Sequence, residues 1–301
     1  MIVKVKEPLP EEYPLIKQGQ IIYTYLHLAA SKELTEALLA SKAKAVAYET
    51  IEDVAGALPL LRPMSEIAGK LSIQAGARCL AKPMGGRGVL LGGAVGVQKA
   101  ECVIIGGGVV GTAALKMALG LGANVTILDN NMERLYYLDD IFGSRIQTLY
   151  STDSTITEAL IKADLVIGAV LVPGAKAPRL IRRSHLKLMK PGAVIVDVAV
   201  DQGGCCETTT PTYHDAPTFV VDDIVHYCVA NMPGAVSRTS AVALTNATLA
   251  YGLKIANHGL EAAIASDKGL KRGVNCYLGQ LTCKEVAEAF DLDYVDIDNL
   301  L

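Results

Sequence analysis

The sequence has few aromatic residues and no long hydrophobic segment. Tryptophan is absent and there are only three phenylalanines, although hydrophobic residues occupy 51% of the 301 positions. An interior built mainly from Ala, Val, Ile and Leu favours an α/β protein over an aromatic-rich β-sandwich. Because no run of about 18 uncharged apolar residues occurs, we predict no membrane span. The first residues, MIVKVKEPLPEEY, contain no apolar stretch of the kind found in signal peptides.

The sequence also lacks a large excess of charge and any paired cysteine motif. The formal net charge of −3 gives no reason to expect binding to nucleic acid or to an anionic membrane. None of the seven cysteines forms a Cys-x-x-Cys pair, and the adjacent Cys205 and Cys206 are unsuited to a tetrahedral zinc site. We therefore predict no metal site, and interpret the cysteines as small buried side chains of a protein in the reducing cytoplasm.

The most informative stretch is ECVIIGGGVVGTAALKMALGLGANVTILDNN, residues 101–131. A short β-branched run precedes a G-x-G-x-x-G motif at Gly106, Gly108 and Gly111, and an Ala-rich helix is predicted to follow. In such a motif the first glycine makes a tight turn, the second lets the backbone approach a pyrophosphate, and the third lets helix and strand pack closely. Asp129 ends the next predicted strand, where its carboxylate can bind a ribose hydroxyl. This arrangement predicts dinucleotide binding.

Strands and helices alternate after this motif, which predicts a doubly wound parallel Rossmann sheet. We predict strands at 102–105, 125–128, 146–150, 165–170, 193–200, 218–220 and 225–229, and helices at 64–80, 109–119, 132–142, 156–163 and 182–189. The first 50 residues predict strands at 2–6, 21–26 and 46–49 with a helix at 32–39. Further helices at 239–257, 259–264 and near the C-terminus are expected to return to this first segment. We therefore expect an NAD-binding domain at 60–237 and a discontinuous, Rossmann-like substrate domain at 1–59 and 238–301.

Several polar residues fall at the ends of predicted strands, where ligands of such sheets bind. His27 follows the apolar run IIYTYL and is either a catalytic acid/base or a core or capping histidine. Asp201, in VDVAVDQGG, is either an acid that orients a histidine or a turn aspartate. Lys6 could hold a substrate carboxylate, although a solvated lysine at a sheet edge is the commoner case.

Ten segments together resemble bacterial L-alanine dehydrogenase over nearly the whole chain. They are KVKEPLPEEY, TYLHLAAS, AYET, PLLRPMSEIAG, GGRGVLLGG, GGGVVGT, GAVLVPGAKAP, VIVDVAVDQGGC, VANMPGAV and ALTNATLAYGL. The resemblance implies NAD-dependent oxidative deamination of L-alanine to pyruvate and ammonium, and the reverse reaction. It also implies a homo-oligomer, a hexamer in this family, whose assembly involves the long helix after the Rossmann domain. Transhydrogenase α subunits are related, but they would require membrane partners, which nothing in the sequence indicates.

The resemblance also implies roles for individual residues. His27 would be the general acid/base with Asp201 as its electrostatic partner, while Lys6 and Tyr25 would bind or line the substrate. The NAD contacts would come from Ser65, Gly106, Gly108, Gly111, Asp129, Arg134, Ser151 and Asn231. Val170 to Val172 would lie along the nicotinamide. Because a carboxylate at Asp129 repels a 2′-phosphate, we expect NAD rather than NADP.

One departure from the family pattern leaves two interpretations. Members of the family begin with a further βαβ region that carries a substrate-binding arginine, and this sequence has no counterpart to it. The resemblance therefore fits either a shortened version of an ordinary enzyme or a genuinely short protein with reduced or no activity. The second alternative is a non-catalytic NAD-binding protein, or an assembly partner of full-length subunits.

Overall fold

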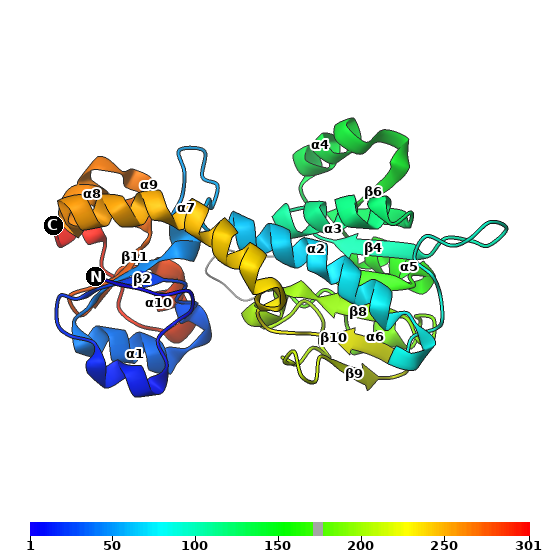
Figure 1. The fold of residues 1–301 in the computed structure, drawn as a ribbon, viewed down its shortest axis with the longest axis horizontal. Coiled ribbons are helices and arrows are strands. Elements are labelled where there is room, and N and C mark those ends of the chain that lie inside the picture. Colours follow the sequence, from blue (N-terminus) through cyan, green and yellow to red (C-terminus); the bar gives the residue numbers. More distant parts are fainter. Residues whose placement is uncertain (171–176) are drawn as a thin grey trace. The chain divides into compact units, whose positions relative to one another are not determined.

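The computed structural model describes residues 1–170 and 177–301, which form two units. Unit 1 contains residues 1–63 and 238–301, and unit 2 contains residues 64–170 and 177–237. Figure 1 shows the elements of each unit. Unit 1 is thus assembled from both ends of the chain, and unit 2 from its middle.

Unit 2 is built on a seven-stranded sheet in the order β6-β5-β4-β7-β8-β10-β9. Its strands are β4 (Glu101–Ile105), β5 (Asn124–Asp129), β6 (Ile146–Tyr150), β7 (Leu165–Gly168), β8 (Val194–Asp197), β9 (Thr218–Val221) and β10 (Ile224–Tyr227). All neighbours are parallel except β9, which pairs antiparallel with β10 at the edge. This order, which reverses direction at β4, is that of the Rossmann fold and confirms the predicted fold class.

Helices cover both faces of this sheet. They are α2 (Arg62–Cys79), α3 (Val109–Gly120), α4 (Met132–Phe142), α5 (Asp153–Lys162) and α6 (Arg183–Leu186). The strands are apolar on both sides: Ile104 contributes to the core beneath α2 and α3, whereas Ile105 contributes to the core beneath α5 and α6. A parallel strand that is buried on both faces requires a continuous apolar run. Such strands can therefore be predicted from the sequence.

Unit 1 has a five-stranded sheet in the order β1-β2-β3-β11-β12. Its elements are β1 (Ile2–Val3), β2 (Ile21–Thr24), α1 (Lys32–Ser41), β3 (Lys44–Ala47), α7 (Ser237–His258), α8 (Leu260–Ser266), α9 (Lys268–Arg272), β11 (Val274–Tyr277), β12 (Gln280–Leu281) and α10 (Lys284–Phe290). Strands β1, β2 and β3 are parallel, and β11 pairs antiparallel with β3. This pairing confirms that the C-terminal segment returns to the first one.

Several predicted boundaries were wrong. The first strand ends at Val3 instead of Lys6, because only Ile2 and Val3 pair with β2. The strand predicted at 193–200 ends at Asp197, whose side chain caps a 3-10 helix over Val198–Gln202. Strands β11 and β12 and helix α9 were not predicted.

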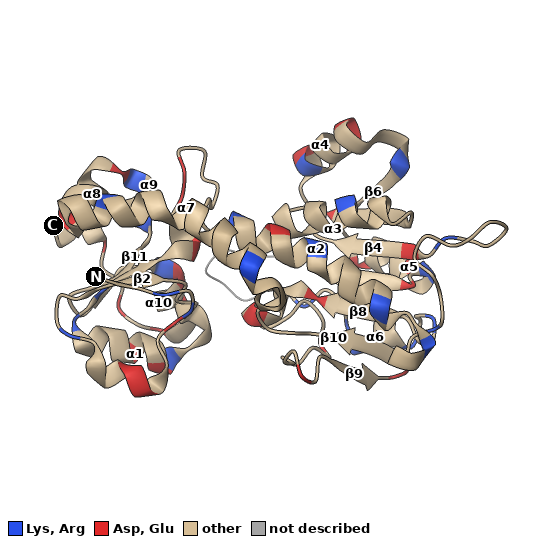
Figure 2. Cartoon of the chain, viewed as in Figure 1, with Lys and Arg blue, Asp and Glu red and all other residues tan. Residues whose placement is uncertain are grey.

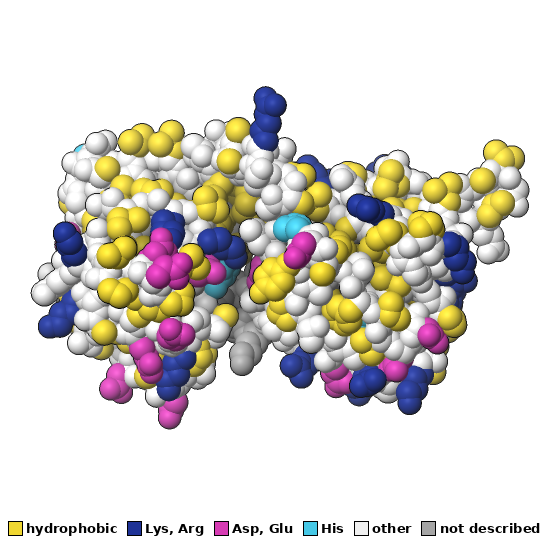
Figure 3. Space-filling view, turned by 60° about the horizontal axis from the view of Figure 1, so that its bottom comes forward, with side chains coloured by type: hydrophobic (Ala, Val, Ile, Leu, Met, Phe, Trp, Pro, Cys, Tyr) yellow, Lys and Arg dark blue, Asp and Glu magenta, His cyan; other side chains and the backbone are white. Residues whose placement is uncertain are grey.

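Charged residues of both signs occur throughout the described parts of both units (Figure 2). Figure 2 shows basic and acidic residues intermixed along the ribbons of both units. The face drawn in Figure 3 likewise mixes charged and apolar side chains. Among the described residues, every helix is too short or too polar to cross a bilayer.

Candidate functional site

The glycine-rich loop lies between β4 and α3 in unit 2, and its three motif glycines are constrained in different ways. Gly106 has a φ of 103°, and a Cβ there would lie 2.6 Å from the Ala169 carbonyl oxygen. A Cβ on Gly111 would lie 1.8 Å from the Gly106 carbonyl oxygen. Gly108, by contrast, has no atom within 4 Å of the position of a Cβ. The protein itself requires the first and third glycines, whereas the second leaves open space where a pyrophosphate can approach the backbone.

Asp129 ties the end of β5 to this loop. One carboxylate oxygen accepts a hydrogen bond of 2.6 Å from the Gly107 N–H, and the other accepts one of 2.8 Å from the Asn131 N–H. The backbone N–H of Ser151 donates to the Asp129 carbonyl, at 2.9 Å. Asp129 and Ser151 therefore end neighbouring strands beside the glycine-rich loop, on the carboxyl edge of the sheet where dinucleotides bind.

Arg134 comes to the same loop from α4. The Asn131 side chain caps this helix by accepting from the Arg134 N–H, at 3.2 Å. The Arg134 guanidinium donates to the Gly107 carbonyl, at 2.5 Å, and to the Thr112 hydroxyl, at 2.6 Å. The structure thus brings Asp129 and Arg134 to the same residue, since Asp129 binds the N–H of Gly107 and Arg134 binds its carbonyl.

Asp201 and Asn231 meet at the next part of the carboxyl edge. Asp201 lies in the 3-10 helix that follows β8, and its exposed carboxylate accepts from the Asn231 N–H at 3.4 Å. Asn231 follows β10 and has a left-handed backbone, with a φ of 58°. The Asp201 carboxylate is therefore bonded to the main chain of Asn231, and both residues are exposed on the surface of unit 2.

A buried aspartate fixes the loop that carries Asp201. The Asp197 carboxylate accepts from the N–H groups of Ala199, at 3.0 Å, and Cys205, at 2.9 Å, and from the Thr209 hydroxyl, at 2.6 Å. Burial raises the pKa of Asp197, while these hydrogen bonds act in the opposite direction. With its oxygens bonded inside the protein, Asp197 organises the loop and is not available to a ligand.

Ser65 lies inside the first turn of α2 and does not cap it. The helix begins at Arg62 because Pro63 fits its first turn, where its missing N–H is not needed. One turn later, a Cβ on Gly69 would lie 2.2 Å from the Val110 carbonyl oxygen, so α2 packs closely against the first turn of α3. This close approach places the first half of α2, which carries Ser65, beside the start of α3, and the NAD contact implied for Ser65 stays a prediction.

His27 lies in unit 1, after Tyr25 and Leu26, because β2 ends at Thr24 and not at Leu26 as predicted. It is partly exposed and has a left-handed backbone, with φ 49° and ψ 40°. Such a backbone costs a non-glycine residue about 1–3 kcal/mol and is found where the surroundings hold it. The imidazole lies parallel to the Tyr25 ring, with centroids 5.8 Å apart and planes at 11°.

Tyr25 and Lys6 also belong to unit 1. Tyr25 is 4% exposed, and its hydroxyl donates to the Leu60 carbonyl at 2.6 Å. Burial raises the pKa of this phenol, so it is a neutral hydrogen-bond donor that is already engaged. Lys6 is partly exposed and lies past the end of β1, where the Thr24 hydroxyl donates to its carbonyl at 2.9 Å.

Glu49 is a residue whose position the sequence did not reveal. Its carboxylate accepts from the N–H groups of His27, at 2.6 Å, and Leu26, at 3.0 Å. The signal available was an acid at the end of a strand next to the one that carries His27. We read it as the last residue of a strand, whereas β3 ends at Ala47 and Glu49 lies in the 3-10 turn that follows.

Two further observations limit the chemistry of the described residues. All seven cysteines are buried and free, which confirms their predicted burial. No group of three or more His, Cys, Asp or Glu residues in the described part of the chain is arranged to hold a metal ion. Of the segment expected along the nicotinamide, Val170 is described, and residues 171 and 172 lie outside the described residues.

Two family models match the chain. The model described as "Alanine dehydrogenase/PNT, N-terminal domain" matches residues 1–68, and the corresponding C-terminal domain model matches residues 72–284. The chain belongs to the alanine dehydrogenase/PNT family. A curated relative, the alanine dehydrogenase of Mycolicibacterium smegmatis, is 54% identical over 301 residues, which is all of this chain and 81% of the relative.

Solved structures give the same family. A structure titled L-alanine dehydrogenase matches with a TM-score of 0.88 and 55% identity, covering 96% of this chain and 80% of the other. A transhydrogenase from Sinorhizobium meliloti matches with a TM-score of 0.73 and 21% identity, covering 94% of this chain and 79% of the other. The second match shows a shared fold only. The family models, the curated relative and the structure titled L-alanine dehydrogenase establish the NAD-binding Rossmann-type domain of this chain.

Proposed function

We propose that this protein catalyses the NAD-dependent oxidative deamination of L-alanine. In the balanced reaction, L-alanine, NAD⁺ and water give pyruvate, ammonium, NADH and a proton, and the reverse reaction aminates pyruvate. The observation that carries the proposal is the glycine-rich loop with open space at Gly108 and an anchored acid at Asp129, in a chain 54–55% identical to alanine dehydrogenases.

We assign the cofactor to unit 2 and the substrate to unit 1. Bound NAD⁺ supplies the acceptor for the hydride that leaves the substrate Cα. The residues that hold it are Ser65, Gly106, Gly108, Gly111, Asp129, Arg134, Ser151 and Asn231. The Asp129 carboxylate favours a free ribose 2′-hydroxyl over a 2′-phosphate, since like charges repel. We therefore expect kcat/KM to be at least tenfold higher with NAD than with NADP, by about 1.4 kcal/mol of discrimination.

The residues of unit 1 handle the substrate. Lys6 provides a cation for the substrate carboxylate. His27 takes the proton from the amine as the imine forms, and then moves protons for the attack of water that releases ammonium. The Tyr25 ring packs parallel to the imidazole and helps to hold it in place. The Tyr25 hydroxyl donates to the Leu60 carbonyl, which fixes the tyrosine ring itself. By family likeness, Asp201 is assigned as the electrostatic partner of His27 in catalysis.

The assay is NADH absorbance with L-alanine as substrate. Substituting His27→Ala should lower kcat by about 100- to 10,000-fold, the usual contribution of a general acid/base. The matched control is His258→Ala, since His258 is exposed at the end of α7. A folded chain that binds NAD but turns over no alanine would instead support the non-catalytic NAD-binding protein or assembly partner.

We further propose a cytoplasmic homo-oligomer, with six copies by family likeness. Seven buried thiols without a disulfide fit a reducing compartment. Helix α7 has 22 residues, and its apolar side chains Val242, Leu249 and Leu253 are 50–59% exposed. Their spacing of seven and four residues places them on one stripe, which a second copy would cover.

A further inference from the structure

One carboxylate binds two consecutive backbone N–H groups at the end of β2. The oxygens of Glu49 accept from Leu26 at 3.0 and 3.3 Å, and from His27 at 2.6 Å. Hydrogen bonds to an ionised acceptor are stronger than those between neutral groups, and successive N–H groups that converge on one anion fix the backbone between them. Glu49 is 22 residues from His27 in the chain, so this is a tertiary contact and no part of a local turn.

The backbone conformation at His27 decides where its imidazole lies. A left-handed residue turns the chain sharply, and here it passes from a strand into the 3-10 helix Leu28–Ala30. This turn places the imidazole parallel to Tyr25, whose hydroxyl is fixed by Leu60. If the two N–H groups lost their acceptor, the extended conformation that most residues prefer would move the ring off Tyr25.

We propose that Glu49 is the positioning residue for His27, because its carboxylate holds the left-handed backbone that sets the imidazole on Tyr25. This inference rests on the proposed function, in which His27 is the acid/base. Glu49 acts through the main chain of His27 and needs no contact with substrate. Substitution of Glu49 should therefore lower kcat and leave the binding of NAD to unit 2 unchanged.

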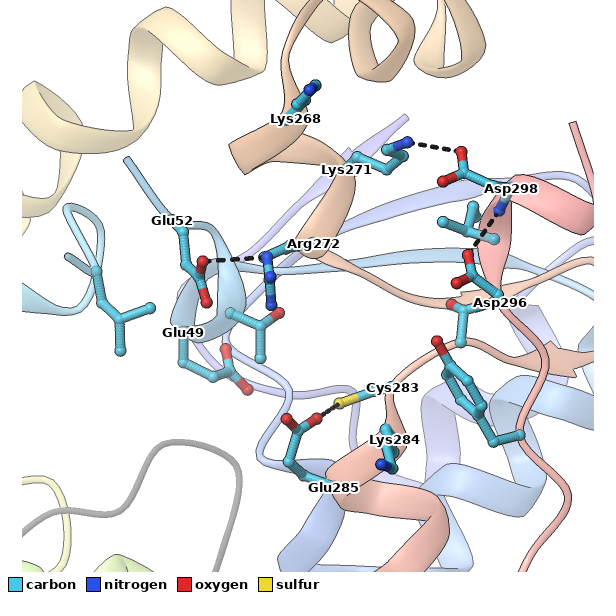
Figure 4. A pocket seen from close by; sticks show the side chains of 15 residues that line it. Glu49, Glu52, Lys268, Lys271, Arg272, Cys283, Lys284, Glu285, Asp296 and Asp298 are labelled. Carbon is cyan, nitrogen blue, oxygen red and sulfur yellow. Dashed lines mark hydrogen bonds and ion pairs between the residues drawn. The ribbon is translucent and has the colours of Figure 1, made fainter. Parts of the chain in front are cut away.

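Glu49 also lines a cavity of about 450 Å³ within unit 1. Figure 4 shows its side chain on the same wall as Glu52 and Arg272. Two other acids that line the cavity have different partners: Glu52 pairs with Arg272 at 3.1 Å, and Glu285 accepts from the Cys283 thiol at 3.3 Å. The cavity has room for a small carboxylate to take the place of the Glu49 side chain.

The first experiment is chemical rescue. Glu49→Ala should lower kcat about 10- to 100-fold, the loss expected from a misplaced catalytic group, with a change below threefold in the Kd of NAD. Formate should restore kcat at least fivefold in Glu49→Ala and should not affect Glu52→Ala, which removes an acid from the same cavity. A kcat for Glu49→Ala within a factor of two of the parent, or equal stimulation of both variants by formate, would overturn the proposal.

The second experiment does not depend on activity. In protein labelled with [15N]histidine, the short hydrogen bond from the His27 N–H to the Glu49 carboxylate should give the His27 amide proton a strongly downfield NMR resonance. This resonance should move upfield in Glu49→Gln, and the other four histidine amides should move little. An unmoved His27 resonance would refute the positioning role, whereas a moved resonance in a chain without turnover would count against the proposed function alone.

Discussion

At the scale of single residues, glycine has different structural roles at different positions of the loop between β4 and α3. Asp129 accepts from the N–H of Gly107 and Arg134 donates to its carbonyl, while Gly111 leaves room for the Gly106 carbonyl. Gly106 and Gly111 are thus constrained from within the protein. At Gly108 the described residues leave the space beside the backbone open, so the protein itself does not constrain this position in the same way.

Substitutions at two glycines should therefore separate folding from binding. Gly111→Ala should lower the free energy of unfolding by about 1–3 kcal/mol or more, because its Cβ would overlap a carbonyl oxygen. Gly108→Ala should change that free energy by less than about 0.5 kcal/mol but weaken NAD binding about tenfold or more. Urea unfolding and calorimetric titration with NAD measure the two quantities. Equal stability of both variants would contradict the assigned roles.

Much of the candidate site could be predicted from the sequence, because its residues follow buried strands. Asp129 and Ser151 end their strands as expected, and the residue types alone suggested anion binding at the glycines. The environment of each side chain could not be predicted. Nothing local indicated that Tyr25 donates to Leu60, or that Glu49 binds the backbone of His27, because both contacts join residues more than 20 positions apart.

At the scale of elements, helices and strands were predicted where the spacing of apolar residues indicates burial. They were missed where a strand forms only because it pairs with a distant segment. Helix α4 and strand β6 have the expected limits, and in α4 the buried Leu135, Leu138 and Phe142 recur at helical spacing. Strand β11 is only four residues long and includes Asn275, so its strand character comes from pairing with β3, more than 220 residues earlier. The Asn275 side chain donates to the Thr50 hydroxyl at 3.0 Å, which lets a polar residue occupy a buried strand.

Strands β2 and β3 and the turns after them carry a tyrosine cluster that should make unit 1 sensitive to alkali. Tyr48 packs edge-on against Tyr23 and Tyr25, with centroids 4.4 and 5.0 Å away. Burial raises the pKa of Tyr48 to about 12 and raises that of Tyr23 as well. An unfolded tyrosine loses its proton near pH 10, so the unfolded state binds fewer protons than the folded state above that pH.

The stability contributed by these phenols should thus be complete below pH 10 and decline as the pH rises through 12. Urea midpoints recorded by circular dichroism between pH 8 and 12 test this, with tyrosinate absorbance followed in parallel. Tyr48→Phe should flatten the decline, since it removes the titrating hydroxyl and keeps the ring. A midpoint independent of pH in this range would contradict the prediction.

At the scale of the whole molecule, the two units differ in how the chain forms them. The described residues of unit 2 come from the middle of the chain, whereas unit 1 needs both ends of the chain to complete its sheet. The C-terminal strand β11 pairs with β3 of the first segment, as expected, because the predicted strands of the Rossmann sheet all lie before residue 238. The exact strands that meet could not be predicted, since a register between distant segments leaves no local pattern.

The exposed stripe of α7 leads to a prediction about assembly. Leu249→Arg together with Leu253→Arg should reduce the mass in solution from that of the oligomer towards one copy, because charges would replace apolar contacts. Light scattering after size-exclusion chromatography measures this mass. The control is Lys254→Ala, on the same helix, where the lysine pairs with Asp267 at 2.8 Å. A parent protein that is already monomeric would remove the basis for the proposed hexamer.

The seven buried thiols give the folded protein built-in reporters of local opening. Cys276 and Cys283 belong to unit 1, and the remaining five belong to unit 2. A maleimide reagent cannot reach any of them until its surroundings separate, and desolvation raises the pKa of Cys102 and Cys276 to about 12, which suppresses the reactive thiolate. Pulsed alkylation read by peptide mass spectrometry would therefore reveal, without any introduced probe, which unit opens first and whether NAD delays labelling only in the unit that holds it.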